Sequence, residues 1–381
     1  MAGADSAAPI SLAEEERTST PWRDAWRLFR RNRAAVVALG VIVAIFSLAI
    51  SAPLLTHIGL LDARAGDAAR HVINPANVPQ VDVYPDPGTC ARDGQDQNPY
   101  WCGWLSDDVR LDVQNKYCYR PAPDPNARQW CYLLGGDSSG RDWLTQTVYG
   151  GQVSLAVGVL GATMSLIVGL IYGLVAGYYG GRIDNVMMRI IDFMYGVPSL
   201  VLVILLQVFF TELSREYQST DRGGAIGLLI ELNASMGGLL FLFIALGTLS
   251  WIGMARLARG QVLAYREKEF VEAARAVGAS DRRIIFVHLV PNIIGPLIVA
   301  ETLAVPGYIF TEAFLSFIGL GVQPGTPSWG AMISEVRNRG GFFSNRFILI
   351  VPSVALVLTA LSFNFLGDGL RDALDPRLRG T

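Results

Sequence analysis

Residues 269–292 read EFVEAARAVGASDRRIIFVHLVPN, a polar stretch that lies between two long apolar runs. Its first half consists mostly of good helix formers, and Gly278 favours the left-handed conformation that closes a helix. Ser280 is suited to cap a second helix. Pro291 is suited to open the next apolar helix, because a missing N–H costs little in the first helical turn. The stretch therefore predicts a helix, a tight turn and a second helix.

The charges around this stretch indicate on which side of a membrane it lies. Seven cations stand between the two apolar runs, against four acids; they are Arg256, Arg259, Arg266, Lys268, Arg275, Arg282 and Arg283. By the positive-inside rule, this excess predicts a cytoplasmic loop. A cytoplasmic helix–turn–helix is suited to dock a soluble partner, with Ala273 and Ala274 as a smooth surface and Glu272 as a charged group beside it. On shape alone, an ordinary solvated loop is the alternative.

The composition of the chain indicates an integral membrane protein. Hydrophobic residues make up 51% of the 381 residues and charged residues 17%, whereas soluble domains carry about 25% charged residues. A spanning helix needs about 20 mainly apolar residues. Six runs qualify, and they lie at about 34–55, 154–179, 193–212, 237–254, 292–312 and 347–366. We therefore predict an all-α fold with six transmembrane helices, of which the first is a retained anchor rather than a signal peptide. The net charge of −2 gives no indication of nucleic-acid binding.

Clusters of arginine also orient the termini. Arginines precede the first apolar run at 23–33, and others occupy the predicted loop 180–192 and the tail after the sixth run. In a six-span arrangement these regions share one side with the 269–292 stretch, so both termini are predicted to be cytoplasmic. Residues 1–20 are expected to be disordered. The aromatic and basic helix that follows either lies in the membrane interface or extends the first span.

An external insertion at 56–133 has a composition unlike the rest of the chain, rich in Pro, Asp, Asn and Gly. It contains all four cysteines, which are Cys90, Cys102, Cys118 and Cys131. An even number of cysteines in one external segment predicts two disulfides, and the sequence leaves all three pairings open. No Cys-x-x-Cys pair is present, so a zinc site is not expected. Tyr and Trp residues gather in the same segment and form either a small core or a contact surface for an external protein.

Three features lie inside the apolar runs. Small residues recur at every fourth position of the second run, at Gly161, Ser165, Gly169, Gly173 and Gly177. Such a face lets another helix approach closely in lipid, either as ordinary packing or as a seam beside a transport path. In the fifth run, Glu301 is costly to place in lipid, so it either faces a translocation path or is a hydrogen-bonded structural group. Pro198 is expected to kink or to start the third helix.

The sequence offers no support for enzymatic chemistry. A P-loop needs Gly-Lys followed by Ser or Thr, and neither lysine of the chain follows a glycine. The three histidines, His57, His71 and His288, show no metal-ligand spacing and no catalytic triad. We therefore expect no catalytic residue, no metal and no cofactor on this chain. Any ATP hydrolysis on which this chain depends is therefore expected to occur in a separate subunit.

The 269–292 stretch resembles the EAA loop of binding-protein-dependent ABC importer permeases. Five residues fall in register with that pattern: Glu272, Ala273, Ala274, Gly278 and Pro291. The group before the proline, His288-Leu289-Val290, departs mildly from it. Three further segments resemble the dipeptide, oligopeptide and nickel branch of these permeases: LGGDSSGRD at 134–142, EAFLSFIGLG at 312–321 and PGTPSWG at 324–330. The resemblance covers roughly 27–53 and 134–379.

The resemblance implies the type I ABC importer permease fold. A first transmembrane helix at 34–55 then precedes the insertion, a permease core spans 134–366, and a cytoplasmic tail follows at 367–381. The five EAA residues are implied to couple the permease to partner ATPase subunits, which bind ATP and magnesium. A second homologous permease, an external solute-binding protein and a place in the cell membrane of a bacterium or archaeon are also implied.

The implied solute is a di- or oligopeptide, and nickel or another small solute is the alternative. Two other classes of protein are alternatives to an ABC importer permease. An ion-coupled secondary transporter often shows inverted internal repeats, and none is found here. A membrane scaffold or receptor, which would use the cysteine-containing insertion, would require a signalling domain inside the cell.

Overall fold

The computed structural model describes residues 21–58, 61, 118–119, 130–131, 143–220, 224–322, 326–338 and 346–374. The helices are α1 (Pro21–Arg31), α2 (Arg33–His57), α6 (Trp143–Tyr179), α7 (Gly181–Tyr195), α8 (Ser199–Thr220), α9 (Ala225–Ser235), α10 (Leu239–Tyr265), α11 (Glu269–Ala276), α12 (Asp281–Arg283), the π-helical η3 (Ile284–Leu289), α13 (Val290–Phe317), α14 (Trp329–Asn338) and α15 (Arg346–Leu374). Two short strands, β1 (Cys118–Tyr119) and β2 (Trp130–Cys131), pair antiparallel.

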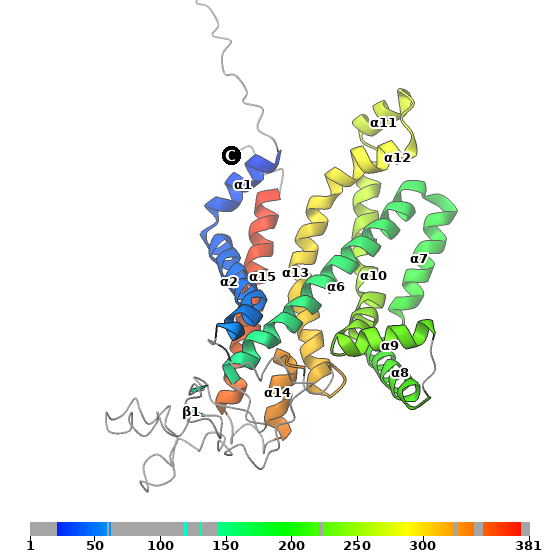
Figure 1. Cartoon of the computed structure of the whole chain (residues 1–381). Coiled ribbons are helices and arrows are strands. Elements are labelled where there is room, and N and C mark those ends of the chain that lie inside the picture. The colour runs from blue at the N-terminus through cyan, green and yellow to red at the C-terminus, as the bar shows by residue number, and fades with distance from the viewer. Residues whose placement is uncertain are drawn as a thin grey trace, which may run out of the picture.

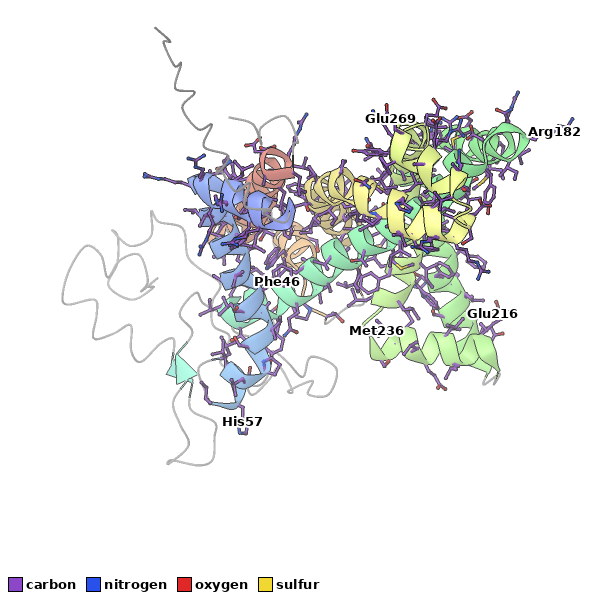
Figure 2. The ribbon with its side chains drawn as sticks, turned by 90° about the horizontal axis from the view of Figure 1, so that it is seen from above. Phe46, His57, Arg182, Glu216, Met236 and Glu269 are labelled. Atoms are coloured by element: carbon purple, nitrogen blue, oxygen red, sulfur yellow. The ribbon has the colours of Figure 1, made fainter. Side chains whose placement is uncertain are left out.

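The long helices form a bundle with two distinct ends (Figure 1). Helices α1, α11 and α12 lie at one end, which we call the α11 end, and α14 lies at the opposite end, which we call the α14 end. Seen from above the α11 end, Arg182 of α7 and Glu269 of α11 lie at one corner, whereas Phe46 and His57 of α2 lie on the other side (Figure 2).

Five helices are long and apolar enough to cross a membrane: α2, α6, α10, the continuous helix Asp281–Phe317 and α15. A sixth span results if α7 and α8 count as one broken helix, because the two are bent by 79° at a short break. The predicted number of six membrane helices therefore corresponds to five continuous helices and one bent pair. Pro198 lies at that break and α8 starts directly after it, as the sequence predicted.

Several boundaries differ from those that the apolar runs predicted. The second span starts at Trp143 rather than near 154, because the polar residues Thr145 and Gln146 are buried within the bundle. The segment 180–192, predicted as a loop, is instead the helix α7. The sixth helix continues to Leu374 rather than ending near 366.

Helix α6 runs obliquely through the bundle and joins two clusters of buried apolar residues (Figure 1). Its first half contributes Leu155 and Ala162 to a cluster with α2, α13, α14 and α15. Its second half contributes Leu174 and Tyr178 to a cluster with α10, α11, η3 and α13. The segment at the α11 end is therefore packed on the same helix that reaches the α14 end.

The aromatic and basic helix before the first span is a separate element. Asn32 interrupts the helix, and its side chain accepts a hydrogen bond from the Ala35 N–H at 3.2 Å, which caps α2. Ala25 and Phe29 of α1 are buried against Ala373 of α15. Helix α1 is thus docked on the bundle, and its position in a membrane interface stays a prediction.

Candidate functional site

The 269–292 segment extends from the α11 end as a helix, a tight turn and a second helical stretch (Figure 1). The turn contains Gly278, whose φ of 84° lies in the left-handed region. The Gly278 N–H donates to the Arg275 carbonyl at 2.9 Å, and the Ala279 N–H donates to the Ala274 carbonyl at 3.0 Å. These two bonds form a Schellman motif, which closes α11 and requires the positive φ that glycine adopts without strain.

In the second half of the segment, helical structure continues from Asp281 into α13 without a break, whereas the sequence predicted a separate second helix. Ser280 occupies the N-cap position of α12, but its side chain makes no capping hydrogen bond. The π-helical turn η3 follows, and Pro291 then lies in the first turn of α13. A proline lacks the N–H that would complete the preceding α-helical turn, and a π-turn accommodates the gap. The Asn292 side chain donates to the His288 carbonyl at 2.6 Å and so satisfies one acceptor there.

The segment is fixed to the membrane helices by apolar and polar contacts. Val271 of α11 and Ile284 and Leu289 of η3 are buried in the cluster that α6, α10 and α13 share. The Tyr178 hydroxyl of α6 donates to Asp281 Oδ1 at 2.7 Å. Because of these contacts, a displacement of α11 would also displace the end of α6.

The outer face of α11 is apolar and uncovered. Phe270, Ala273 and Val277 recur at the i, i+3, i+7 spacing of one helical face, and we call these three residues the exposed stripe. Val277 is 89% exposed and Phe270 41% exposed. Glu272 is exposed beside the stripe, whereas Ala274 is half-buried.

The small-residue face of α6 packs mostly against α10. A Cβ at Gly173 would lie 2.6 Å from the Ala255 carbonyl oxygen and 2.7 Å from the Arg259 nitrogen. A Cβ at Gly169 or Gly177 would lie 2.9 or 3.1 Å from the nearest backbone atom of α10. Gly161 instead faces the ring of Tyr308 on α13. The structure thus brings α6 and α10 into backbone contact, which is the packing that small residues allow between helices in lipid.

Two arginine–aspartate pairs, one near each end of α7, hold this helix against α10. Arg259 binds Asp184 through two hydrogen bonds, of 2.5 and 2.6 Å. Arg256 binds Asp192 at 2.5 Å and lies over the Tyr195 ring at 4.2 Å. These pairs explain why a charged stretch is helical here, since its acids are neutralised by a neighbouring helix.

Glu301 is buried where α6, α10 and α13 meet. Its Oε1 accepts a hydrogen bond from Ser165 at 2.5 Å, and its Oε2 accepts one from Tyr308 at 3.2 Å. The Ser165 hydroxyl also lies 3.1 Å from the Ser250 carbonyl of α10. Glu301 is 6% exposed. The structure therefore brings Ser165 of the small-residue face together with Glu301, and the predicted contact of Glu301 with a translocation path stays a prediction.

Glu301 substitutions separate packing from a path contact. Glu301→Gln keeps an acceptor of the same size, so we expect a nearly unchanged midpoint of thermal unfolding. Glu301→Ala removes the acceptor of the Tyr308 hydroxyl and leaves Ser165 with only the Ser250 carbonyl, and it is expected to cost about 1–3 kcal/mol. Circular dichroism of the purified chain measures both effects. Uptake decides the path contact, because normal uptake by the Gln variant at normal protein amounts would contradict it.

A second buried carboxylate was not singled out from the sequence. Glu312 of α13 has no exposed surface and accepts hydrogen bonds from Ser316 at 2.7 Å and from Ser154 of α6 at 3.1 Å. Ser154 also accepts the Trp329 N–H at 3.3 Å, which ties the start of α14 to this cluster. The signal was an acid near the end of an apolar run. Ser316 is four residues away on the same helix, but Ser154 of α6 lies 158 positions away in the sequence and no local pattern reveals it.

Two of the predicted cysteines, Cys90 and Cys102, lie outside the described residues. Cys118 and Cys131 lie on β1 and β2, where the register pairs their Cα positions. In the part of the chain that the structure describes, no group of three or more His, Cys, Asp or Glu residues is arranged to hold a metal ion.

Comparison with known proteins agrees with this arrangement. The family model for the binding-protein-dependent transport system inner membrane component matches residues 169–380. The chain belongs to this family. Residues 20–64 also match the N-terminal transmembrane domain of oligopeptide transport permease C. Members are transport components of ABC importers, in which a separate subunit hydrolyses ATP, so the prediction that this chain is not itself the ATPase is confirmed.

Three relatives show how far the similarity extends. The oligopeptide transport system permease protein OppC of Haemophilus influenzae is 41% identical over 248 residues, covering 65% of this chain and 71% of the relative. The dipeptide transport system permease protein DppC of Bacillus subtilis is 35% identical, and the alignment covers 94% of this chain and 86% of the relative. OppC of Escherichia coli is 36% identical, and the alignment covers 94% of this chain and 92% of the relative. This permease family therefore accounts for nearly the whole chain.

Proposed function

We propose that this permease forms one part of the translocation path of an importer that takes up di- and oligopeptides with the energy of ATP. The relatives named for peptide transport support the solute class. Nickel or another small solute remains the alternative within the same transport role.

The observation that carries the proposal is the exposed stripe on α11. An apolar face at the tip of a charged segment is costly to leave in water and suits a groove on another protein. We assign that groove to the ATPase subunit and the coupling role to Glu272, Ala273, Ala274, Gly278 and Pro291. The Schellman turn fixes α11 relative to α12, and the continuous helix from Asp281 passes the movement of the ATPase to α13.

The remaining partners follow from the same assignment. A second homologous permease would complete the path, and an external solute-binding protein would deliver the peptide at the α14 end. The arginine-rich α11 end then lies in the cytoplasm with both termini, and the chain lies in the cell membrane of a bacterium or archaeon. We keep a permease core that starts near 134 as a proposal, with its last helix extending to Leu374 rather than ending at 366.

The insertion at 56–133 is proposed to be external and disulfide-bonded. Cys118 and Cys131 are directly opposite each other in the antiparallel pair of strands, a placement that brings the Cβ atoms of paired residues close. This register supports Cys118–Cys131 among the three pairings and leaves Cys90 with Cys102. Proteolytic peptides linked in the other two patterns under non-reducing conditions would contradict it.

Reconstitution tests the proposed function. The permease, its partner permease and its ATPase subunits are placed in proteoliposomes, and the loaded binding protein is added outside. We expect labelled peptide to accumulate only when ATP is inside and the binding protein is present. Uptake by this chain alone with an ion gradient, or uptake of nickel and not of peptide, would contradict the proposal.

A further inference from the structure

We propose that Glu312 positions α14 so that the nucleotide state of the ATPase subunit, acting at α11, changes how tightly the external binding protein is held at the α14 end. The inference rests on the proposed function, because it takes an ATPase at one end and a binding protein at the other. It adds the residue on which communication between the two ends depends. Five buried residues form the group around it, which we call the α14 anchor: Ser154, Glu312, Ser316, Ser328 and Trp329.

The α14 anchor joins three helices in a place closed to solvent. The Glu312 carboxylate of α13 accepts a hydrogen bond from Ser154 of α6, and Ser154 in turn accepts the Trp329 N–H in the first turn of α14. The Ser328 hydroxyl caps α14 by accepting the Ala331 N–H at 3.0 Å, and it also interacts with Glu312. The carboxylate therefore lies at the positive end of the α14 dipole, which stabilises a negative charge there.

The start of α14 is also fixed by direct contact with the two long helices. A Cβ at Gly330 would overlap the Ala313 backbone of α13. The Trp329 indole N–H donates to the Thr147 carbonyl of α6 at 2.9 Å. Because the contact at Gly330 is between backbones, the start of α14 has to move together with α13.

Hydrogen bonds join α6 to the continuous helix Asp281–Phe317 at three levels of the bundle (Figure 1). From the α11 end to the α14 end, the pairs are Tyr178 with Asp281, Ser165 with Glu301 and Ser154 with Glu312. The continuous helix has 37 residues, a length of about 55 Å. It begins just after the turn at Gly278 and ends beside the α14 anchor. A displacement at α11 is therefore carried to α14 by two helices that are joined along their length.

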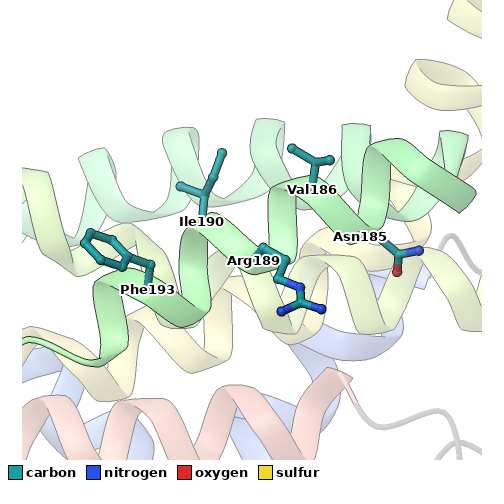
Figure 3. A pocket seen from close by; sticks show the side chains of 5 residues that line it. All are labelled: Asn185, Val186, Arg189, Ile190 and Phe193. Carbon is teal, nitrogen blue, oxygen red and sulfur yellow. The ribbon is translucent and has the colours of Figure 1, made fainter.

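A route through α7 and α8 is interrupted by comparison. These two helices are bent by 79° at a break that contains Pro198. Figure 3 shows Val186, Ile190 and Phe193 on one face of α7, and this face is open, with Phe193 79% exposed. Because a bend absorbs displacement, α6 and the continuous helix are the stiffer connection between the two ends.

The test measures how tightly the complete importer binds the loaded binding protein, once without nucleotide and once with a non-hydrolysable ATP analogue. The ratio of the two dissociation constants reports the coupling between the ends, and a change that weakens both states equally leaves this ratio unchanged. We expect Ser154→Ala to lower the wild-type ratio about fivefold, which is within the range for mutations that change coupling between sites. Glu312→Gln should act in the same direction, because an amide lacks the charge that faces the start of α14.

Ser362→Ala is the matched control. Ser362 of α15 is buried like Ser154, but its hydroxyl donates to the Leu358 carbonyl of its own helix at 2.7 Å. The replacement removes the same group without breaking a link between helices, so its ratio is expected to equal that of the wild type. All variants are compared as purified importers that retain the ATPase subunits. If Glu312→Gln yields no folded importer, Ser154→Ala alone decides.

The outcomes separate coupling from folding. An unchanged ratio for Ser154→Ala, or an equal change in both of its dissociation constants, shows that the α14 anchor only stabilises the fold and overturns the proposal. An equal fall for Ser362→Ala also overturns it. So does a wild-type importer that binds the binding protein equally well in both nucleotide states, although peptide uptake under ATP would then leave the proposed function intact. If the wild type takes up no peptide under ATP, the proposed function itself is wrong and the inference falls with it.

Discussion

Ala273→Arg is expected to reduce ATP-driven uptake to about one-hundredth of the wild-type rate or less. Ala273 is the central residue of the exposed stripe, between Phe270 and Val277. A guanidinium placed there would have to be desolvated in a groove shaped for a small side chain, at a cost of about 3–5 kcal/mol when no counterion is present. An energy near 3 kcal/mol already corresponds to about a hundredfold weaker association.

Two measurements establish that docking is lost rather than folding. The Ala273→Arg permease should be obtained in normal amounts, with normal helicity, but should no longer retain the ATPase through purification. Ala264→Arg is the matched control, since Ala264 is also exposed but lies on α10 outside the 269–292 segment; its uptake and ATPase retention are expected to be normal. Retention of the ATPase and normal uptake by the Ala273→Arg variant would remove the coupling role from this helix.

Gly173→Leu is expected to lower the midpoint of thermal unfolding by about 10 °C or to prevent accumulation of the folded chain. A Cβ at Gly173 would lie 2.5 Å from the Ala258 Cβ and closer than a van der Waals contact to two backbone atoms of α10. Flexible side chains can move aside, but the α10 backbone cannot do so without separating the two helices. Overpacking of this kind costs about 1–3 kcal/mol for smaller insertions, and each kcal/mol corresponds to about 2–4 °C in domains of about 150–250 residues.

Gly260→Leu provides the comparison for this effect. Gly260 lies in α10, and a Cβ there would meet nothing within 4 Å, so helix propensity favours the replacement. Gly173→Ala should give an intermediate loss, because it introduces the clash with less volume. Fluorescence-detected size-exclusion chromatography after heating measures all three variants. Equal stability of the variants at Gly173 and Gly260 would show that the close approach of α6 and α10 does not stabilise the fold.

The sequence was enough to predict those parts of the structure that depend on residues close together in the chain. The apolar runs located the spans, Gly278 located the turn, and Pro198 located the break between α7 and α8. The nature of 180–192 could not be recognised in the same way. Its charges, taken alone, indicate a solvated loop. The helix is favourable because Arg256 and Arg259 of α10 form ion pairs with the two acids of this segment.

The buried carboxylates illustrate the same limit within the candidate site. Glu301 stood out because an acid within an apolar run is costly, yet its partner Ser165 lies 136 positions away in the sequence. Glu312 carries a similar signal nearer the end of its run and was passed over. The predicted residues of the 269–292 segment follow a contiguous pattern, whereas these clusters depend on how α6 crosses α13.

The backbone contact between α6 and α10 limits how the permease can move during the transport cycle. Gly169, Gly173 and Gly177 leave no space between α6 and the Met254, Ala258 and Val262 side chains of α10, so these helices cannot slide or rotate past each other without a steric clash. They therefore behave as one rigid body during the transport cycle. The flexing has to occur elsewhere, and the interruption between Tyr195 and Ser199 is a natural hinge, where α8 could swing relative to that body while the charge pairs keep α7 attached to it.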